Sequence, residues 1–98
     1  MDDFKRIFYM IKKRPGIATG DKKISYVSHY FAGFLSEEGK FISDEYLKIS
    51  NWIYEYFTNR GYNINISIWW HTMIYEVTKD EELAWNLLFE IINDYLNV

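Results

Sequence analysis

The sequence predicts an all-α protein that folds as a single-domain bundle of about five helices, and three observations lead to this prediction. Apolar residues recur at three- and four-residue spacing along most of the chain, and helix-capping residues separate the apolar runs. The length of 98 residues suits one domain, so residues 1–98 are expected to share one core. With 49% hydrophobic and 26% charged residues, the composition excludes a disordered chain.

The first two predicted helices are separated by a loop. The first covers about residues 2–13 and must end before Pro15, because proline disfavours the α conformation of the residue before it. One proline and two glycines predict the loop over residues 14–20. The second helix is expected over about residues 22–38, with Gly39 at the position that glycine commonly takes after a helix.

A serine and a glycine bound the third predicted helix. Ser43 is the expected N-cap, and Gly61 follows the last residue, Arg60. The fourth helix is expected over about residues 66–77, where apolar residues follow the i, i+3, i+4, i+7 spacing. Segment 63–68 also alternates polar and apolar residues, as strands do, but no second strand is predicted to pair with it.

The fifth predicted helix begins at a capping box. Thr78 and Glu81 have the spacing at which a hydroxyl and a carboxylate each accept a hydrogen bond from an otherwise unpaired backbone amide. The helix then continues to about residue 96 with one apolar face. The chain is therefore expected to end in two consecutive amphipathic helices.

Few residues are available for catalysis or metal binding. The chain has no cysteine, and neither of its two histidines, His29 and His71, has a carboxylate three or four residues away. Adjacent carboxylates fall at helix ends, where capping and the helix dipole account for them. We therefore expect no enzyme activity, no cofactor and no metal ion. No apolar stretch approaches the roughly 18 residues of a membrane span, and the lack of cysteine fits the cytoplasm.

Charge is distributed unevenly along the chain. Residues 1–23 carry a net charge of +4, whereas residues 24–98 carry −7. An acidic surface repels the phosphate backbone of nucleic acids and attracts basic partners. The acidic residues expected to bind a partner are Glu76, Asp80, Glu81, Glu82, Glu90 and Asp94.

Aromatic residues make up 20% of the chain, which is more than its core is expected to hold. Exposed tyrosine and tryptophan are typical anchors of protein interfaces, because they give large contact area at a low cost in entropy. The candidate anchors are Tyr46, Tyr54 and Trp85, although Leu88 and Ile92 follow Trp85 at core spacing.

Two segments resemble parts of a group of small bacterial helical proteins. They are residues 11–20, IKKRPGIATG, and residues 80–95, DEELAWNLLFEIINDY. In that group the N-terminal helix ends in an Arg-Pro-x-Met-Tyr-Leu-Gly loop, and the last helix is acidic and rich in phenylalanine or tryptophan. This chain departs from the pattern by having Ile17, Ala18 and Thr19 in place of Met, Tyr and Leu.

The group that these segments resemble is the immunity proteins of contact-dependent growth inhibition and related toxin systems. The resemblance implies a cytoplasmic protein that binds a cognate toxin, commonly the C-terminal nuclease domain of a larger secreted protein, and blocks its basic groove. It implies neither nucleic acid nor membrane as a partner. Two other classes stay open: an adaptor or regulatory domain that binds another protein, and a nucleic-acid-binding domain that uses the basic N-terminal third.

Overall fold

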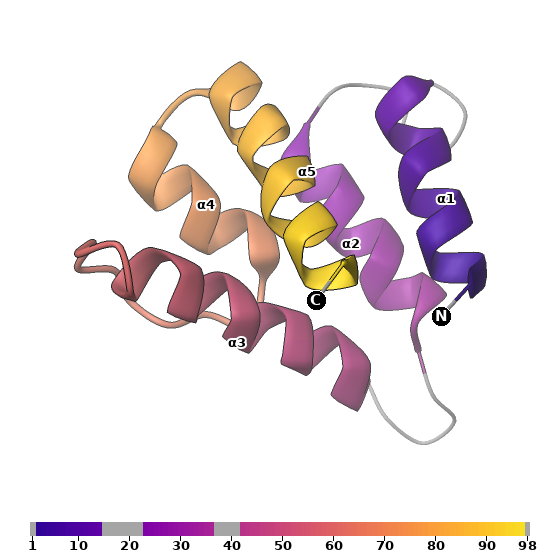
Figure 1. Ribbon diagram of the computed structural model, residues 1–98, viewed down its shortest axis with the longest axis horizontal. Coiled ribbons are helices and arrows are strands. Elements are labelled where there is room, and N and C mark those ends of the chain that lie inside the picture. Colours follow the sequence, from indigo (N-terminus) through magenta and orange to yellow (C-terminus); the bar gives the residue numbers. More distant parts are fainter. Residues whose placement is uncertain (1, 15–22, 37–41, 98) are drawn as a thin grey trace.

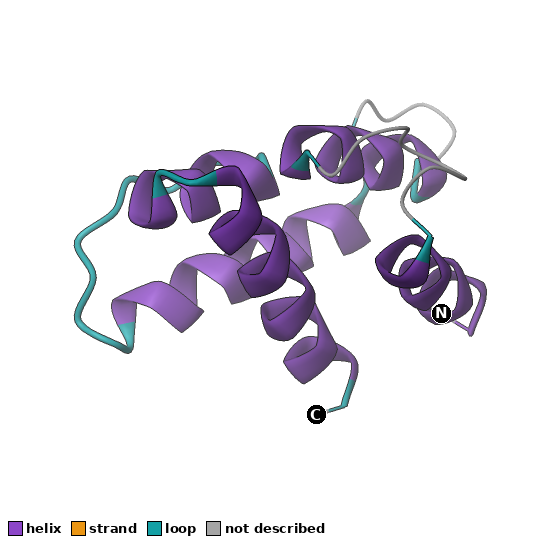
Figure 2. Ribbon diagram, turned by 90° about the horizontal axis from the view of Figure 1, so that it is seen from above, coloured by secondary structure: helices purple, strands orange, loops and turns teal. Residues whose placement is uncertain are grey.

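The computed structural model describes residues 2–14, 23–36 and 42–97, and in this part of the chain it contains helices and no strand (Figures 1 and 2). This confirms the prediction of an all-α single domain. The five helices are α1 (Asp2–Lys13), α2 (Ile24–Phe34), α3 (Asp44–Thr58), α4 (Trp70–Thr78) and α5 (Glu81–Leu96). No described helix has both the length and the apolar character needed to cross a membrane.

Helices α4 and α5 pack against each other, and each of them also packs against α2 and α3. In Figure 1, α5 lies in front of α2, α3 runs below both, and α1 lies on the outer side of α2. Helix α1 joins this core through aromatic rings. The ring centroids of Phe4 and Phe31 lie 4.8 Å apart, as do those of Phe8 and Phe89. The shared core therefore draws side chains from α1, α2 and α5 as well as from α3 and α4.

Local capping explains both ends of α3. The Ser43 hydroxyl accepts a hydrogen bond of 3.1 Å from the Tyr46 amide, as predicted for the N-cap. At the other end, Gly61 has a φ angle of +87°, and the amide of Tyr62 donates to the Phe57 carbonyl at 3.1 Å. These features make up a Schellman turn, for which glycine is favoured. The prediction that Gly61 ends this helix is confirmed, with Thr58 as the last helical residue.

Helix α4 begins at Trp70, so the predicted start at residue 66 is wrong. Hydroxyl groups bind the backbone just before the helix. The Ser50 hydroxyl donates to the Ile68 carbonyl at 2.6 Å, and the Ser67 hydroxyl accepts from the Trp69 amide at 3.1 Å. These bonds involve residues 67–69, the end of a connector over residues 62–69, and Ile66 in that connector is 63% exposed instead of buried.

The predicted capping box before α5 is also wrong. Asp80 is the N-cap, because its carboxylate accepts a hydrogen bond of 2.9 Å from the Leu83 amide. Thr78 belongs to α4, where its hydroxyl donates to the Ile74 carbonyl at 3.1 Å. Lys79, with a φ angle of +51°, ends α4 and separates the two helices by a tight turn. Aspartate is as good an N-cap as threonine, so the position of this turn decides which residue is used.

The predicted second helix is longer than the observed one. Helix α2 ends at Phe34, and its last described backbone bonds include Leu35 to Phe31 at 2.9 Å. The predicted stop at Gly39 lies outside the described residues, as does most of the predicted loop 14–20.

Candidate functional site

One face of α5 carries three exposed carboxylates. Glu82, Glu90 and Asp94 follow one another along the helix, with the exposed Asn86 midway between the first two. Residues at four-residue spacing share one side of an α-helix. No described basic side chain forms an ion pair with any of the three. We call Glu82, Glu90 and Asp94 the acidic stripe.

The other three predicted acidic residues bind backbone amides. Asp80 caps α5, as described above. The Glu81 carboxylate lies 3.4 Å from the amide of Ile24, the first residue of α2, and the Glu76 carboxylate accepts from the Asn65 amide at 3.1 Å. The six acidic residues therefore divide into three that support the fold and three that form the acidic stripe.

Tyr46 is a core residue, which corrects its prediction as an exposed anchor. Its side chain is 0% exposed, its ring stacks on that of Trp70 at 4.4 Å, and its hydroxyl is hydrogen-bonded to the Ser28 hydroxyl. Burial raises the pKa of Tyr46 to about 12. The sequence contained the correct signal, because Ile49 and Ile53 follow Tyr46 at core spacing on α3.

Trp85 is also buried, so its prediction as an exposed anchor is wrong. It is 4% exposed, and its ring centroid lies 4.7 Å from that of Phe89. The core spacing of Leu88 and Ile92 relative to Trp85 was the better guide, and both are buried. Tyr54 is half-buried against the core, so only one of the three predicted aromatic anchors keeps a partly exposed ring.

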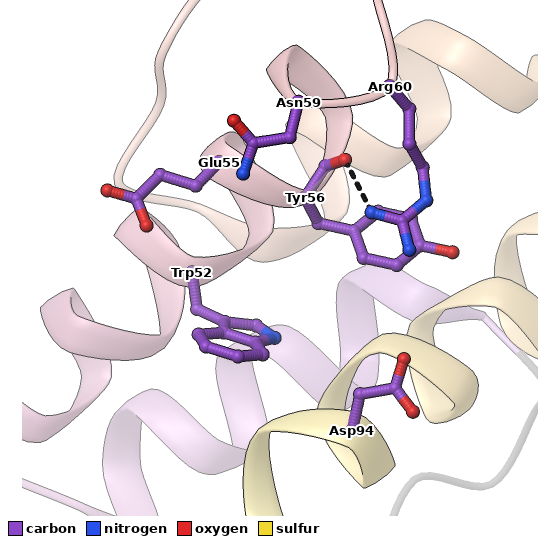
Figure 3. A pocket seen from close by; sticks show the side chains of 6 residues that line it. All are labelled: Trp52, Glu55, Tyr56, Asn59, Arg60 and Asp94. Carbon is purple, nitrogen blue, oxygen red and sulfur yellow. Dashed lines mark hydrogen bonds between the residues drawn. The ribbon is translucent and has the colours of Figure 1, made fainter. Parts of the chain in front are cut away.

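A pocket of about 260 Å³ lies between α3 and the last turn of α5 (Figure 3). Most of its lining comes from α3 and the turn that follows it, while Asp94 of the acidic stripe lines it from α5. The lining residues are Trp52, Glu55, Tyr56, Asn59, Arg60 and Asp94. We call this the α3–α5 pocket.

Arg60 lies over the ring of Tyr56 inside this pocket. Its guanidinium carbon is 3.5 Å from the centre of the ring, and its Nη1 donates a hydrogen bond of 3.0 Å to the Tyr56 carbonyl (Figure 3). A cation over an aromatic face is a favourable arrangement. Arg60 forms no ion pair with Glu55 or Asp94, and within the described chain no other basic group pairs with these carboxylates.

Trp52 joins the two sides of the pocket. Its indole Nε1 donates to the Ile91 carbonyl on α5 at 3.3 Å, and its ring packs against that of Tyr95 with a centroid distance of 5.5 Å. The Tyr95 hydroxyl in turn donates to the Glu45 carboxylate at 2.8 Å. Burial, followed by this carboxylate, raises the pKa of Tyr95 to about 12. The aromatic wall of the pocket is thus fixed by contacts between α3 and α5.

Five of the six pocket residues were not predicted from the sequence. Trp52, Glu55 or Tyr56, and Asn59 recur at helical spacing on α3, which was the available signal for a shared face. Asp94 was predicted as a binding residue on charge alone. Its position opposite Tyr56 follows from the packing of α5 on α3, which local spacing does not reveal.

A second hollow, of about 390 Å³, has the opposite charge. It is lined on α1 and just beyond it by three basic and two other side chains, namely Arg6, Lys13, Arg14, Tyr9 and Met10. Arg6 is also 3.8 Å from Asp3 in an exposed ion pair, which contributes little to stability. The basic character predicted for the N-terminal third is therefore present on the described surface of α1.

The two histidines lie next to each other, which the sequence did not predict. The ring centroids of His29 on α2 and His71 on α4 are 5.2 Å apart, and Trp69 lies 4.7 Å from His29. Burial, and to a smaller extent His29, lower the pKa of His71 from its ordinary 6.5. Among the described residues no group of three potential ligands could hold a metal ion, so we assign none to this pair.

Comparisons with family models, curated proteins and solved structures found no match to this chain. The function must therefore be argued from the acidic stripe and the α3–α5 pocket.

Proposed function

We propose that this chain is an immunity protein, which binds a toxin domain and blocks its basic active site or substrate groove. The acidic stripe is the observation that carries this proposal. Its three carboxylates, those of Glu82, Glu90 and Asp94, are exposed on one helix and lack an ion-pair partner among the described residues. Their field is therefore available to attract a basic partner.

The length of the acidic stripe matches an elongated groove. Asp94 lies twelve residues after Glu82 on α5, which corresponds to about 18 Å along an α-helix. A nuclease groove is basic because it must hold a phosphate backbone. A row of carboxylates is complementary to such a groove, and opposite charges also accelerate association.

The resemblance to immunity proteins supports a toxin as the partner. One of the two segments that carry the resemblance, residues 80–95, includes the whole acidic stripe. Inhibition by occlusion requires binding and no chemistry of its own. In this proposal the protein therefore works without a catalytic residue, a cofactor or a metal ion, and it meets the toxin in the cytoplasm.

The test is affinity capture of a partner from the native cells, followed by an assay of that partner's activity. The tagged wild-type chain and the Glu82→Gln/Glu90→Gln variant are compared at low and at moderate salt. We expect the wild-type chain to retain one stoichiometric protein whose nuclease activity is lost in the complex. We expect the variant to associate with this partner roughly tenfold more slowly at low salt, because two of the three stripe carboxylates are neutralised.

A matched control has the same net charge as the stripe variant. Asn63→Lys/Asn65→Lys changes the charge by the same amount as the stripe variant, at exposed positions in the connector between α3 and α4. Equal association rates for the control and stripe variants would remove the acidic stripe from the proposal. A captured partner that keeps its full activity in the complex would overturn the immunity function and favour an adaptor.

Nucleic-acid binding is the second candidate, and the basic hollow on α1 is the observation that favours it. Arg6, Lys13 and Arg14 line that hollow. Binding of DNA or RNA by the isolated chain should then weaken steeply with salt. Filter binding between about 50 and 200 mM salt measures this. Retention of nucleic acid that is lost in an Arg6→Gln/Lys13→Gln variant would establish this function in place of the proposed one.

A further inference from the structure

The α3–α5 pocket has the size of one long side chain. Its volume of about 260 Å³ is below the roughly 300–1,000 Å³ of pockets that enclose drug-sized ligands. It opens beside the acidic stripe and shares Asp94 with it. A partner attracted by the stripe would thus bring its own side chains to the mouth of this pocket.

The pocket already binds a guanidinium group from its own chain. Arg60 covers the ring of Tyr56 at 3.5 Å and is held by one hydrogen bond, to the Tyr56 carbonyl. This arrangement uses the aromatic face but leaves the carboxylates of Glu55 and Asp94 without a described cation. The pocket therefore offers more negative charge than Arg60 neutralises.

The chemistry of the lining favours arginine over lysine. Trp52 and Tyr56 provide aromatic surface on the α3 side, and Asp94 provides a carboxylate on the α5 side (Figure 3). A planar guanidinium stacks on aromatic rings and forms paired hydrogen bonds with a carboxylate, whereas an ammonium group acts as a point charge. One arginine side chain could use both features of the pocket at once.

We propose that the α3–α5 pocket receives an arginine side chain of the basic partner, in competition with Arg60. The incoming guanidinium stacks against Tyr56 and pairs with Asp94, while Glu55 supplies further negative charge. Arg60 is exposed and held by few contacts, so it can leave the ring. This inference rests on the proposed function, because it assumes a basic protein partner.

Competition with Arg60 makes a directional prediction. Arg60→Gln removes the internal cation and should tighten binding of a hexaarginine peptide about two- to fivefold, the range expected for an exposed cation–π contact. Lys12→Gln is the matched control, because it removes one positive charge from the exposed surface of α1. If Arg60 had only a structural role, its loss would leave binding at the control level or weaken it.

The experiment measures binding of hexaarginine and hexalysine peptides by calorimetry and maps the contacts by NMR. We expect hexaarginine to bind more tightly and to shift the indole signal of Trp52. We expect the Glu55→Gln/Asp94→Asn variant to bind hexaarginine at least fivefold more weakly than the wild-type chain. Equal affinities for the two peptides, or equal effects of Arg60→Gln and Lys12→Gln, would overturn the pocket proposal.

The results that would overturn the proposed function differ from those that would overturn the pocket proposal. If the captured partner depends on Glu82 and Glu90 but binds Arg60→Gln and the Lys12→Gln control equally well, the pocket proposal is overturned and the proposed function stands. If the partner keeps its activity in the complex while hexaarginine binds at Trp52 as expected, the immunity function is overturned and the arginine pocket stands.

Discussion

The core of this protein has two parts that are held together in different ways. The first attaches α1 mainly by apolar packing: Phe8 packs against Phe31, at 6.2 Å, and Phe89, at 4.8 Å, and the part-buried Tyr9 hydroxyl adds one hydrogen bond to the Asn93 side chain of α5. The second joins α2, α3 and α4 and contains buried hydrogen bonds around Tyr46. We call them the aromatic seam and the polar core.

The polar core relies on fully buried hydrogen bonds, which are directional, whereas the aromatic seam relies mainly on ring packing. The Tyr46 hydroxyl is bonded to Ser28 of α2, and the Tyr46 carbonyl accepts from the indole of Trp70 of α4 at 3.2 Å. A buried hydrogen bond constrains both distance and angle, whereas ring packing tolerates rearrangement. The aromatic seam therefore mainly buries apolar surface, whereas the polar core fixes the positions of α2, α3 and α4 relative to one another.

The largest expected effect breaks the aromatic seam. Phe8→Ala should lower the free energy of unfolding by about 3–5 kcal/mol, because it removes a buried ring and leaves a cavity. Phe8→Met should cost about 1.5 kcal/mol or less, since it keeps most of the apolar volume. Urea unfolding monitored by circular dichroism measures both. Similar losses for the two variants would show that the seam depends on ring geometry after all.

The polar core should lose stability at high pH, because it contains the ionisable Tyr46. Tyr46 has its pKa raised to about 12 by burial, whereas an unfolded tyrosine ionises near pH 10. The unfolded state therefore releases its proton first, and stability should fall as pH rises from 10 to 12. The loss from Tyr46 should reach roughly 3 kcal/mol, because each pKa unit corresponds to about 1.4 kcal/mol.

Two tyrosine variants isolate this contribution in urea unfolding between pH 9 and 12. Tyr46→Phe should flatten the pH dependence. Tyr95→Phe should keep the share that belongs to Tyr46, because the pKa of Tyr95 is raised at a separate site beside Glu45. If the two variants have identical profiles, Tyr46 is not the group that makes the polar core sensitive to alkali.

A smaller effect should follow from Ser50, which ties the polar core to the start of α4. Ser50→Ala leaves the Ile68 carbonyl without its described partner and should cost about 1–3 kcal/mol. Amide exchange near residues 67–70 should accelerate before it does elsewhere. Ser36→Ala, at an exposed position after α2, is the control and should change neither quantity. If amide exchange is unchanged in Ser50→Ala, the Ser50 hydrogen bond does not stabilise the start of α4.

The smallest effect concerns the histidine pair beside the polar core. The pKa of His71 is lowered in the folded state, so the unfolded chain takes up a proton first as the pH falls. Stability should therefore decrease as the pH falls below 6.5, the ordinary value, towards the lowered pKa. His71→Gln should remove this decrease, as followed by thermal unfolding from pH 7.5 to 5. If the pH dependence of stability is unchanged in that variant, groups other than His71 cause the decrease.

Most features that depend on residues close in the sequence were predictable, although the N-cap of α5 was misassigned to Thr78 instead of Asp80. The all-α class, the Ser43 cap and the Gly61 turn follow from spacing and from backbone preferences over a few residues. Features that depend on distant residues were not. The start of α4 is set by Ser50, eighteen residues before the carbonyl it binds, which no local pattern contains.

The same distinction, between features set by nearby residues and features set by distant ones, applies to the proposed binding surface. The acidic stripe could be predicted, since Glu82, Glu90 and Asp94 share a face through helical spacing alone. The α3–α5 pocket could not, because Tyr56 and Asp94 line the same pocket only through the packing of α5 on α3. Tyr46 was misassigned for another reason: it was taken as an interface anchor because tyrosine is common at interfaces, although its spacing relative to Ile49 and Ile53 places it in the core.

The contact between Glu81 and Ile24 bears on the order in which the chain folds. Helix α2 has no side-chain hydrogen bond from its own N-cap, Lys23, and no acidic residue in its first turn. The carboxylate near its first amide comes from Glu81, fifty-seven residues later. Helix α2 therefore receives this stabilisation only after the ribosome has synthesised the start of α5. The native core, in which α5 contacts α2, α3 and α4, can close only after α5 has left the ribosome.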